Sequence, residues 1–101
     1  MIVIRNVFRL KFGKAREAVA LFKEGNAIQH RIGGGMNFPT RILTDLTGTF
    51  YTVVLEVTAQ SLTAFEAEVP RLMSDKDWQA NYQKVAALVE SGYREIFSVV
   101  E

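Results

Sequence analysis

The stretch MNFPTRILTDLTGTFYTVVLEVT, residues 36–58, holds two runs rich in β-branched and aromatic residues around a Thr-Gly-Thr sequence at 47–49. Two such runs joined by a short glycine-containing loop predict an antiparallel β-hairpin. Residues 36–48 form its first predicted strand and residues 49–58 its second. Pro39 has no backbone N–H for a neighbouring strand, so we expect the first strand to start at a sheet edge.

Towards the N-terminus, residues 2–12 alternate with period two, which is typical of a β-strand. One face of this strand is predicted to carry Ile2, Ile4, Asn6, Phe8, Leu10 and Phe12, and the other Val3, Arg5, Val7, Arg9 and Lys11. After a turn at Gly13, apolar residues recur at intervals of three and four over residues 15–32, which predicts an amphipathic helix. Gly25 costs about 1 kcal/mol relative to Ala in a helix, so we expect a bend or fraying there.

Three glycines at 33–35 follow this helix and precede a strand. A phosphate-binding glycine loop has the opposite order, from strand to helix, and no Walker Lys-Ser/Thr pair is present. Gly33 is therefore predicted to end the helix in a left-handed conformation, and Gly34 and Gly35 to let the chain reverse. The alternative is a loop that also contacts a ligand.

A second helical region follows Ser61, a predicted N-cap. Pro70 is expected to kink or restart the helix. Ser74 and Asp77 resemble a capping box for the continuation, and Gly92 is predicted to end it. The apolar positions at helical spacing are Leu62, Phe65, Val69, Leu72 and Met73, followed by a stripe of Trp78, Tyr82, Val85 and Val89.

The tail YREIFSVV, residues 93–100, is the fourth predicted strand. The order β-α-β-β-α-β predicts an α+β, ferredoxin-like fold in a single domain, residues 1–101, whose four-stranded antiparallel sheet has both helices on one face. The opposite sheet face also carries apolar residues, which need a covering partner. We therefore expect a symmetric homodimer that pairs sheet to sheet. The apolar residues expected there are Val3, Val7, Phe50 and Val54.

Composition excludes several classes of protein. The chain has 101 residues, a net charge of +1 and no cysteine. A charge near zero gives no support to nucleic-acid or membrane binding. The absence of cysteine excludes disulfides, thiolate metal sites and a cysteine nucleophile. With no predicted signal peptide or membrane span, we expect a cytoplasmic location.

Three segments carry a resemblance to a known family: RNVFRLKFGKAREAV at 5–19, SDKDWQANYQK at 74–84, and the tail at 93–100. Over nearly its whole length the chain resembles the dimeric α+β barrel proteins, in particular NIPSNAP-like and antibiotic-biosynthesis-monooxygenase-like members. Residues 74–79 are similar to the Asp-Pro-Glu-Trp-Gln stretch of NIPSNAP-like proteins, with Lys76 in place of the proline. Such resemblance supports fold more than function.

The resemblance implies several activities, because members include cofactor-free monooxygenases of phenolic or quinol substrates, haem-degrading enzymes and isomerases. Haem-degrading members use a first-strand asparagine, a tryptophan and an axial histidine. Asn6 matches the first position and Trp78 approximately the second. Tyr82 occupies the histidine position, which argues against haem degradation.

Five residues are the candidate ligand-binding positions: Asn6, Phe8, Tyr51, Trp78 and Tyr82. Asn6 interrupts an apolar set, so its amide is expected to face the helices and either bond to backbone or water or form the floor of a pocket. Trp78 and Tyr82 would stand above it, either as core residues or as part of a small-molecule site. His30 is expected to interact with the end of its helix. The charged strand residues Arg5, Arg9, Arg41, Asp45, Glu56 and Arg94 are expected to form cross-strand or intersubunit pairs.

These observations leave two main hypotheses. The first is a cofactor-independent monooxygenase or isomerase acting on an aromatic or polyketide-like compound. The second is a non-catalytic module that binds a hydrophobic ligand or a protein. Neither requires a cofactor or metal, and a lone histidine without cysteine does not predict a metal site. RNA recognition motifs share the topology, but TGTFYTVV at 47–54 lacks their leading basic residue and second glycine.

Overall fold

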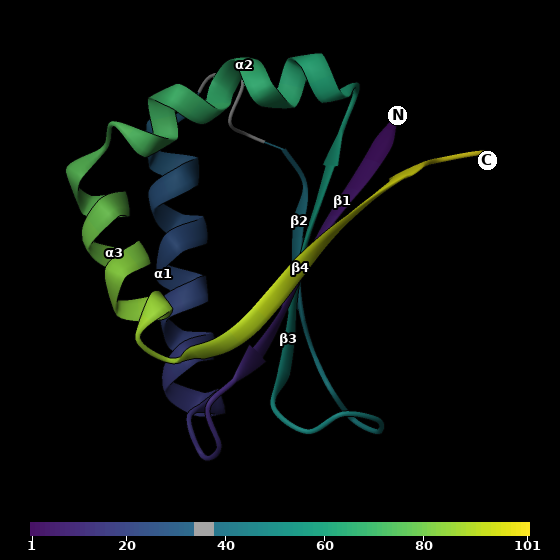
Figure 1. Cartoon of the computed structure of the whole chain (residues 1–101). Coiled ribbons are helices and arrows are strands. Elements are labelled where there is room, and N and C mark those ends of the chain that lie inside the picture. The colour runs from purple at the N-terminus through teal and green to yellow at the C-terminus, as the bar shows by residue number, and fades with distance from the viewer. Residues whose placement is uncertain (34–37) are drawn as a thin grey trace.

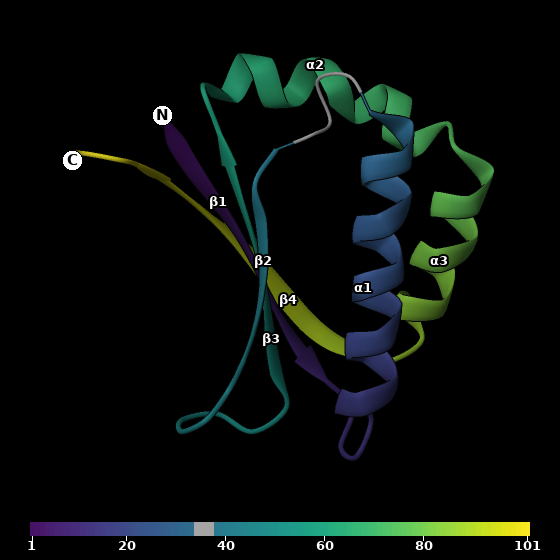
Figure 2. The ribbon, with the colours of Figure 1, turned by 180° about the vertical axis from the view of Figure 1, so that it is seen from behind.

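The computed structural model describes residues 1–33 and 38–101, which form a four-stranded sheet and three helices. The strand order is β2-β3-β1-β4, with every pairing antiparallel. All three helices lie on one side of the sheet (Figure 1), and the view from behind shows the other side uncovered by any helix (Figure 2). The predicted ferredoxin-like fold is confirmed. The elements in chain order are β1 (Ile2–Leu10), α1 (Ala15–Ile32), β2 (Thr40–Thr44), β3 (Thr52–Ala59), α2 (Leu62–Met73), α3 (Lys76–Ala86) and β4 (Val89–Ser98).

The period-two pattern of β1 assigns its residues to the two faces of the sheet. Phe8 stacks on Phe22 of α1 with ring centroids 5.5 Å apart, which places the even-numbered set on the helix-facing side. Val7 belongs to the other face, opposite Val54 of β3 and Tyr93 of β4. The alternation expected from the sequence is therefore confirmed.

The core lies between α1 and the β1–β3 centre of the sheet. Its buried members are Leu10, Ala18, Phe22, Val53, Val85 and Leu88. Gly92 lies opposite Phe8, and a Cβ at this glycine would come within 2.9 Å of the Phe8 ring. The prediction that Gly92 ends a helix is wrong, because β4 already begins at Val89 and needs a glycine here to accommodate Phe8.

Gly25 within α1 and Gly33 at its C-terminal cap have different roles. Gly33 ends the helix as predicted, with φ +69° and ψ −155°, so φ is positive as expected but the conformation is not left-handed helical. Its N–H donates to the Gln29 carbonyl. Gly25 does not interrupt the helix, which runs unbroken through it. A Cβ at Gly25 would lie 3.0 Å from Oδ1 of Asn81 on α3. This glycine therefore serves close helix packing, and the expected fraying is wrong because the helix is continuous there. The expected reversal at Gly34 and Gly35 lies outside the described residues.

The second helical region is two helices. Ser61 caps α2 by accepting the Ala64 N–H, as predicted. α2 continues past Pro70 and ends at Met73, and α3 then starts as a separate helix. The predicted Ser74 cap is wrong, because the Ser74 hydroxyl donates to the Arg71 carbonyl. The cap of α3 is instead Asp75.

The hairpin is shorter in its strands and longer in its loop than predicted. β2 spans only Thr40–Thr44, and the loop to β3 covers residues 45–51. Asp45 organises this loop, since its Oδ1 accepts the Thr52 N–H at 3.0 Å. Pro39 lies just before β2, which is an edge strand as expected. Residues 36 and 37 of the predicted strand lie outside the described residues. Across the described ranges, none of the helices has the length and apolarity to span a bilayer.

We predict that Gly25→Ala does not give the stabilisation of about 1 kcal/mol that helix propensity alone would supply. The new methyl group would displace the Asn81 amide, whose Nδ2 donates to the Leu21 carbonyl at 2.9 Å. In an Asn81→Ala background the same substitution should stabilise the protein, because the obstructing side chain is gone. Urea unfolding of the four proteins of this cycle measures the coupling. Equal effects of Gly25→Ala on the free energy of unfolding in both backgrounds would contradict the predicted coupling between residues 25 and 81.

Candidate functional site

Asn6 lies on the helix-facing side of β1, as its position in the alternation predicted. Its side chain is half-buried, and its Oδ1 accepts a hydrogen bond from Nε of Arg94 at 2.7 Å. Arg94 comes from the edge strand β4, directly opposite Asn6 in the register. The Asn6 amide, which was expected to bond to backbone or water or to form a pocket floor, thus has a charged side-chain partner. The expected pairing of Arg94 with a carboxylate of the strands is not seen, because its Nε bonds to Asn6.

Trp78 and Tyr82 are stacked on α3, with ring centroids 5.2 Å apart. Trp78 is half-buried, whereas Tyr82 is 57% exposed. The inward face of α3 is formed by Asn81 and Val85. The predicted aromatic stripe therefore lies partly on the surface of the helix layer, and its tyrosine is accessible from solvent.

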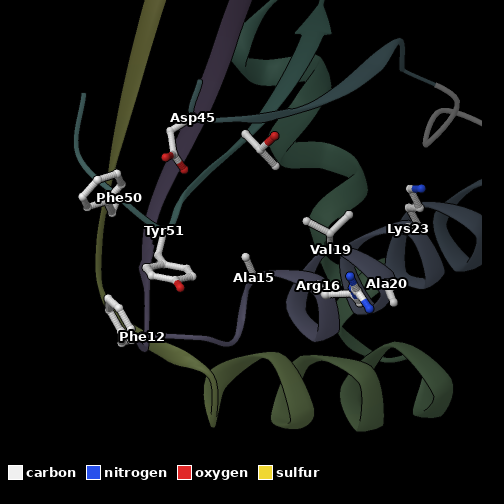
Figure 3. Close-up of a pocket in the computed structure, with 10 residues that line it drawn as sticks. Phe12, Ala15, Arg16, Val19, Ala20, Lys23, Asp45, Phe50 and Tyr51 are labelled. Atoms are coloured by element: carbon white, nitrogen blue, oxygen red, sulfur yellow. The ribbon is translucent and has the colours of Figure 1, made fainter. Parts of the chain in front are cut away.

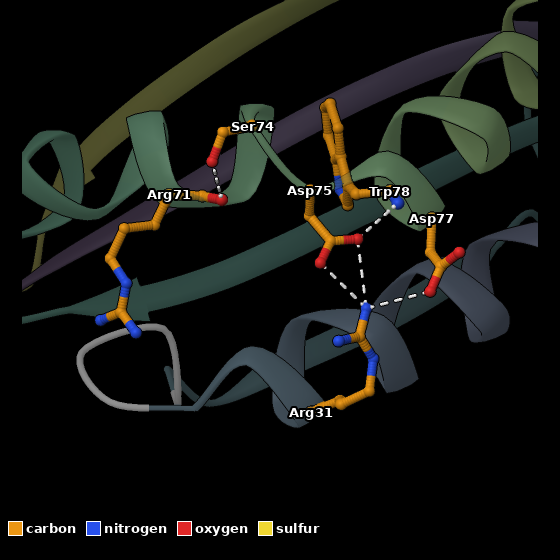
Figure 4. A network of polar contacts seen from close by, with 6 residues as sticks. All are labelled: Arg31, Arg71, Ser74, Asp75, Asp77 and Trp78. Atoms are coloured by element: carbon orange, nitrogen blue, oxygen red, sulfur yellow. Dashed lines mark hydrogen bonds and ion pairs between the residues drawn. The ribbon is translucent and has the colours of Figure 1, made fainter.

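The start of α3 is held by a charged contact with the last turn of α1. Nη2 of Arg31 lies 3.0 Å from Oδ2 of Asp75 and 3.3 Å from Oδ2 of Asp77 (Figure 4). Asp75 also accepts the backbone N–H of Trp78 at 3.0 Å. That N–H, together with the Arg31 guanidinium, holds the pKa of Asp75 below its ordinary value of 3.8. His30 lies in the same last turn of α1.

Phe8 and Tyr51, the remaining candidates, have different surroundings. Phe8 packs within the core against Phe22. Tyr51 has φ +58°, a left-handed conformation that costs a non-glycine residue about 1–3 kcal/mol. Its carbonyl accepts the Leu10 N–H at 2.8 Å, which holds the strained peptide against the end of β1. The Tyr51 ring meets Phe12 edge-on at a centroid distance of 4.8 Å.

Within the described part of the chain, Tyr51 is the one predicted candidate that lines an apolar hollow. This hollow has a volume of about 790 Å³ and lies between α1 and the β2–β3 loop. Figure 3 shows the two walls: the aromatic rings of Phe12, Phe50 and Tyr51 on one side, and α1 side chains on the other. A mainly apolar concavity of this size is the usual form of a small-molecule site. Its lining residues are Phe12, Ala15, Arg16, Val19, Ala20, Lys23, Thr44, Asp45, Phe50 and Tyr51.

Sequence reasoning missed most of this hollow. The alternation pattern predicts Phe12 in the helix-facing set of the first strand and Phe50 on the opposite face of the sheet. Both lie outside the strands, at the loops that follow β1 and precede β3. They are 84% and 74% exposed, respectively. The signal available in the sequence was that each of these large aromatic residues lies close to a glycine turn. The sequence does not show that they line the same hollow, because that depends on the register of the sheet.

Structural comparison identifies the fold. A NIPSNAP family protein from Agrobacterium tumefaciens superimposes with a TM-score of 0.85 and 28% identity, covering 99% of this chain and 93% of the other. An uncharacterized NIPSNAP domain protein from Burkholderia xenovorans gives 0.85 and 20%, covering 99% and 95%. The chain has the NIPSNAP-like fold. No protein-family model and no curated protein matches its sequence.

The same fold occurs in oxygenases. SnoaB, a cofactor-independent oxygenase from Streptomyces nogalater, superimposes with a TM-score of 0.72 and 17% identity, covering 99% of this chain and 93% of the other. Putative antibiotic biosynthesis monooxygenases also share the architecture. The resemblance of this NIPSNAP-like chain to both groups is thus confirmed at the level of the fold.

The helix-free sheet face of the NIPSNAP-like fold carries ion pairs and a second hollow. Glu56 of β3 pairs with Arg41 of β2 and, at 3.8 Å, with Arg5 of β1, as cross-strand pairing predicted. The hollow, about 530 Å³, includes Arg5, Val7 and Arg9. The Nε atoms of Arg5 and Arg9 are buried and have no hydrogen-bond acceptor among residues 1–33 and 38–101. Over those same ranges, no group of three or more side chains is arranged to hold a metal ion.

We predict that Asp75→Asn lowers stability at neutral pH and that its effect disappears in acid. Because the folded-state pKa of Asp75 is depressed, the ionised carboxylate stabilises the fold above pH 4 or so, and this contribution is lost as the pH falls through the folded pKa. Asparagine can still cap α3 but cannot pair with Arg31. The urea unfolding midpoints of the wild type and of Asp75→Asn, measured between about pH 2 and pH 7, should therefore converge at the acid end. An offset between the two proteins that is independent of pH would contradict this prediction.

Proposed function

We propose that the protein binds a small apolar or aromatic molecule in the hollow between α1 and the β2–β3 loop. The observation that carries this proposal is the cluster of exposed rings at its rim, Phe12 and Phe50, beside the strained Tyr51. Exposed apolar surface around a concavity marks an interaction site. Backbone strain of this kind persists where the surrounding structure holds it, and it concentrates at ligand sites.

Catalysis is the second candidate function, as cofactor-independent oxygenation or isomerisation of an aromatic or polyketide-like compound. The hydrogen-bonded pair of Asn6 and Arg94 on the helix-facing side favours it, because an amide N–H and a guanidinium can hold a carbonyl or enolate oxygen. Phe8, Trp78 and Tyr82 remain proposed substrate contacts. Non-catalytic ligand binding requires only the hollow, so it is the function that the geometry supports best.

We also propose that the functional unit is a homodimer formed through the helix-free sheet face. This face combines apolar side chains, such as Phe97 and Tyr93 of β4, with arginines and glutamates of both signs. A face with both signs can pair with its own copy around a two-fold axis. A second copy would also bring acceptors to the buried Nε atoms of Arg5 and Arg9.

The binding proposal predicts that Ala20→Trp blocks a ligand and that Ala80→Trp does not. Ala20 lines the hollow, whereas Ala80 is an exposed helical alanine on α3. Anthrone should raise the thermal unfolding midpoint of the wild type and of Ala80→Trp. It should leave the midpoint of Ala20→Trp unchanged, because the indole at position 20 would fill the hollow. Failure of the wild type to respond to anthrone and to a panel of quinols would overturn the proposal.

Oxygen uptake recorded in the same samples, above a protein-free control, separates catalysis from binding. Binding without uptake supports the non-catalytic module. Uptake that persists unchanged in both Asn6→Ala and Tyr82→Phe would remove these two residues from any catalytic role.

The dimer proposal predicts a sedimenting mass of twice the chain's 11.4 kDa. Phe97→Lys should shift the protein to the monomer, because it puts a charge into the apolar part of the paired faces. Met73→Lys is the matched control, since Met73 is also about half exposed but lies on the helix side at the end of α2. Analytical ultracentrifugation at several concentrations measures both. A wild-type monomer that stays soluble at high concentration would contradict the proposal.

A further inference from the structure

The α1 wall of the hollow carries two cations on one helix face. Arg16, Val19, Ala20 and Lys23 are spaced at three, four and seven residues, which brings them to the same side of the helix. Both charged side chains are exposed, and neither has an ion-pair or hydrogen-bond partner within the described ranges. Figure 3 shows Arg16 and Lys23 on the α1 side of the hollow, across from the aromatic wall.

The acidic residues next to these cations along α1 have other partners. Glu17 follows Arg16 but pairs with Lys14 at 3.9 Å. Glu24 follows Lys23 but accepts a hydrogen bond from Nδ2 of Asn81 on α3 at 3.3 Å. Neither cation on the hollow side of the helix therefore forms an ion pair with the acidic residue that follows it in the sequence.

Among the described residues, Asp45 is the single carboxylate in the lining of this hollow, and it already has a structural role. Its Oδ1 accepts the Thr52 N–H, and its own N–H donates to the Thr52 carbonyl at 3.3 Å. Two cations thus share the hollow with one acid that is bonded into the β2–β3 loop. The remaining surface is mostly apolar and aromatic.

We propose that the ligand of this hollow is a planar aromatic molecule bearing an acidic group, with its rings against Phe12 and Tyr51 and its acid at Arg16 and Lys23. This inference rests on the proposed binding function and specifies its ligand class. Guanidinium and ammonium groups are the protein's natural partners for carboxylates. Aromatic faces separated from two unpaired cations by a hollow match a molecule that is apolar at one end and anionic at the other.

The test compares 2-naphthoic acid with its neutral analogue 2-naphthamide by isothermal titration calorimetry and by ligand-observed NMR. The acid should bind about five- to tenfold more tightly, as expected for two solvent-accessible charge contacts. In Arg16→Gln/Lys23→Gln this preference should vanish while the amide binds as before. Lys76→Gln/Lys84→Gln removes the same net charge from α3 and should keep the preference. The preference should also shrink between about 20 mM and about 500 mM salt.

The outcomes separate the two proposals. Equal binding of acid and amide by the wild type would overturn the acidic ligand class and leave small-molecule binding standing. A preference for the acid that survives Arg16→Gln/Lys23→Gln would place the charge contact elsewhere and overturn the inference. Binding of neither probe, as expected if a second copy of the chain fills the hollow, would overturn the proposed function together with the inference.

Discussion

The packing of α1 on the central strand β1 is the interaction on which the rest of this structure depends. Phe22 of α1 stacks on Phe8, and Phe8 in turn lies close to Gly92 of β4. One aromatic contact therefore joins the helix layer to two neighbouring strands. The Val7 carbonyl limits the space at position 92 as well, because a Cβ there would approach it within 3.1 Å. Because interiors are close-packed, this contact admits little variation in side-chain volume.

The position of α1 determines where both candidate sites of the molecule lie. At its C-terminal half, Gly25 lets Asn81 approach closely, and Arg31 holds the start of α3 through Asp75. These two contacts set where the Trp78–Tyr82 pair lies. At its N-terminal half, the same helix forms the wall of the hollow opposite Tyr51. A single amphipathic helix thus packs the core with one face and presents cations to a cavity with another.

The contacts of the candidate site could be predicted only where the interacting residues are close together in the sequence. The side of the sheet that Asn6 occupies follows from the alternation of its neighbours. Its bond to Arg94 does not, because it depends on the register between strands at opposite ends of the chain. The cap of α3 was missed by one position, since Ser74 and Asp75 are both good caps and only the helix geometry selects Asp75. Phe12 and Phe50 looked like strand residues because hydrophobic periodicity does not mark where a strand ends.

The sequence by itself determined the order of the elements, the faces of β1, the end of α1 at Gly33 and the start of α2 at Ser61. These properties arise from interactions between residues a few positions apart, so local patterns encode them. The tertiary structure alone decided that Gly25 and Gly92 serve close packing. It also decided that the aromatic ring of Tyr51, from the β2–β3 loop, faces α1 across a hollow. Such features depend on which distant surfaces meet, and that is fixed by the packing of the whole chain, because no local pattern records the volume left between two elements.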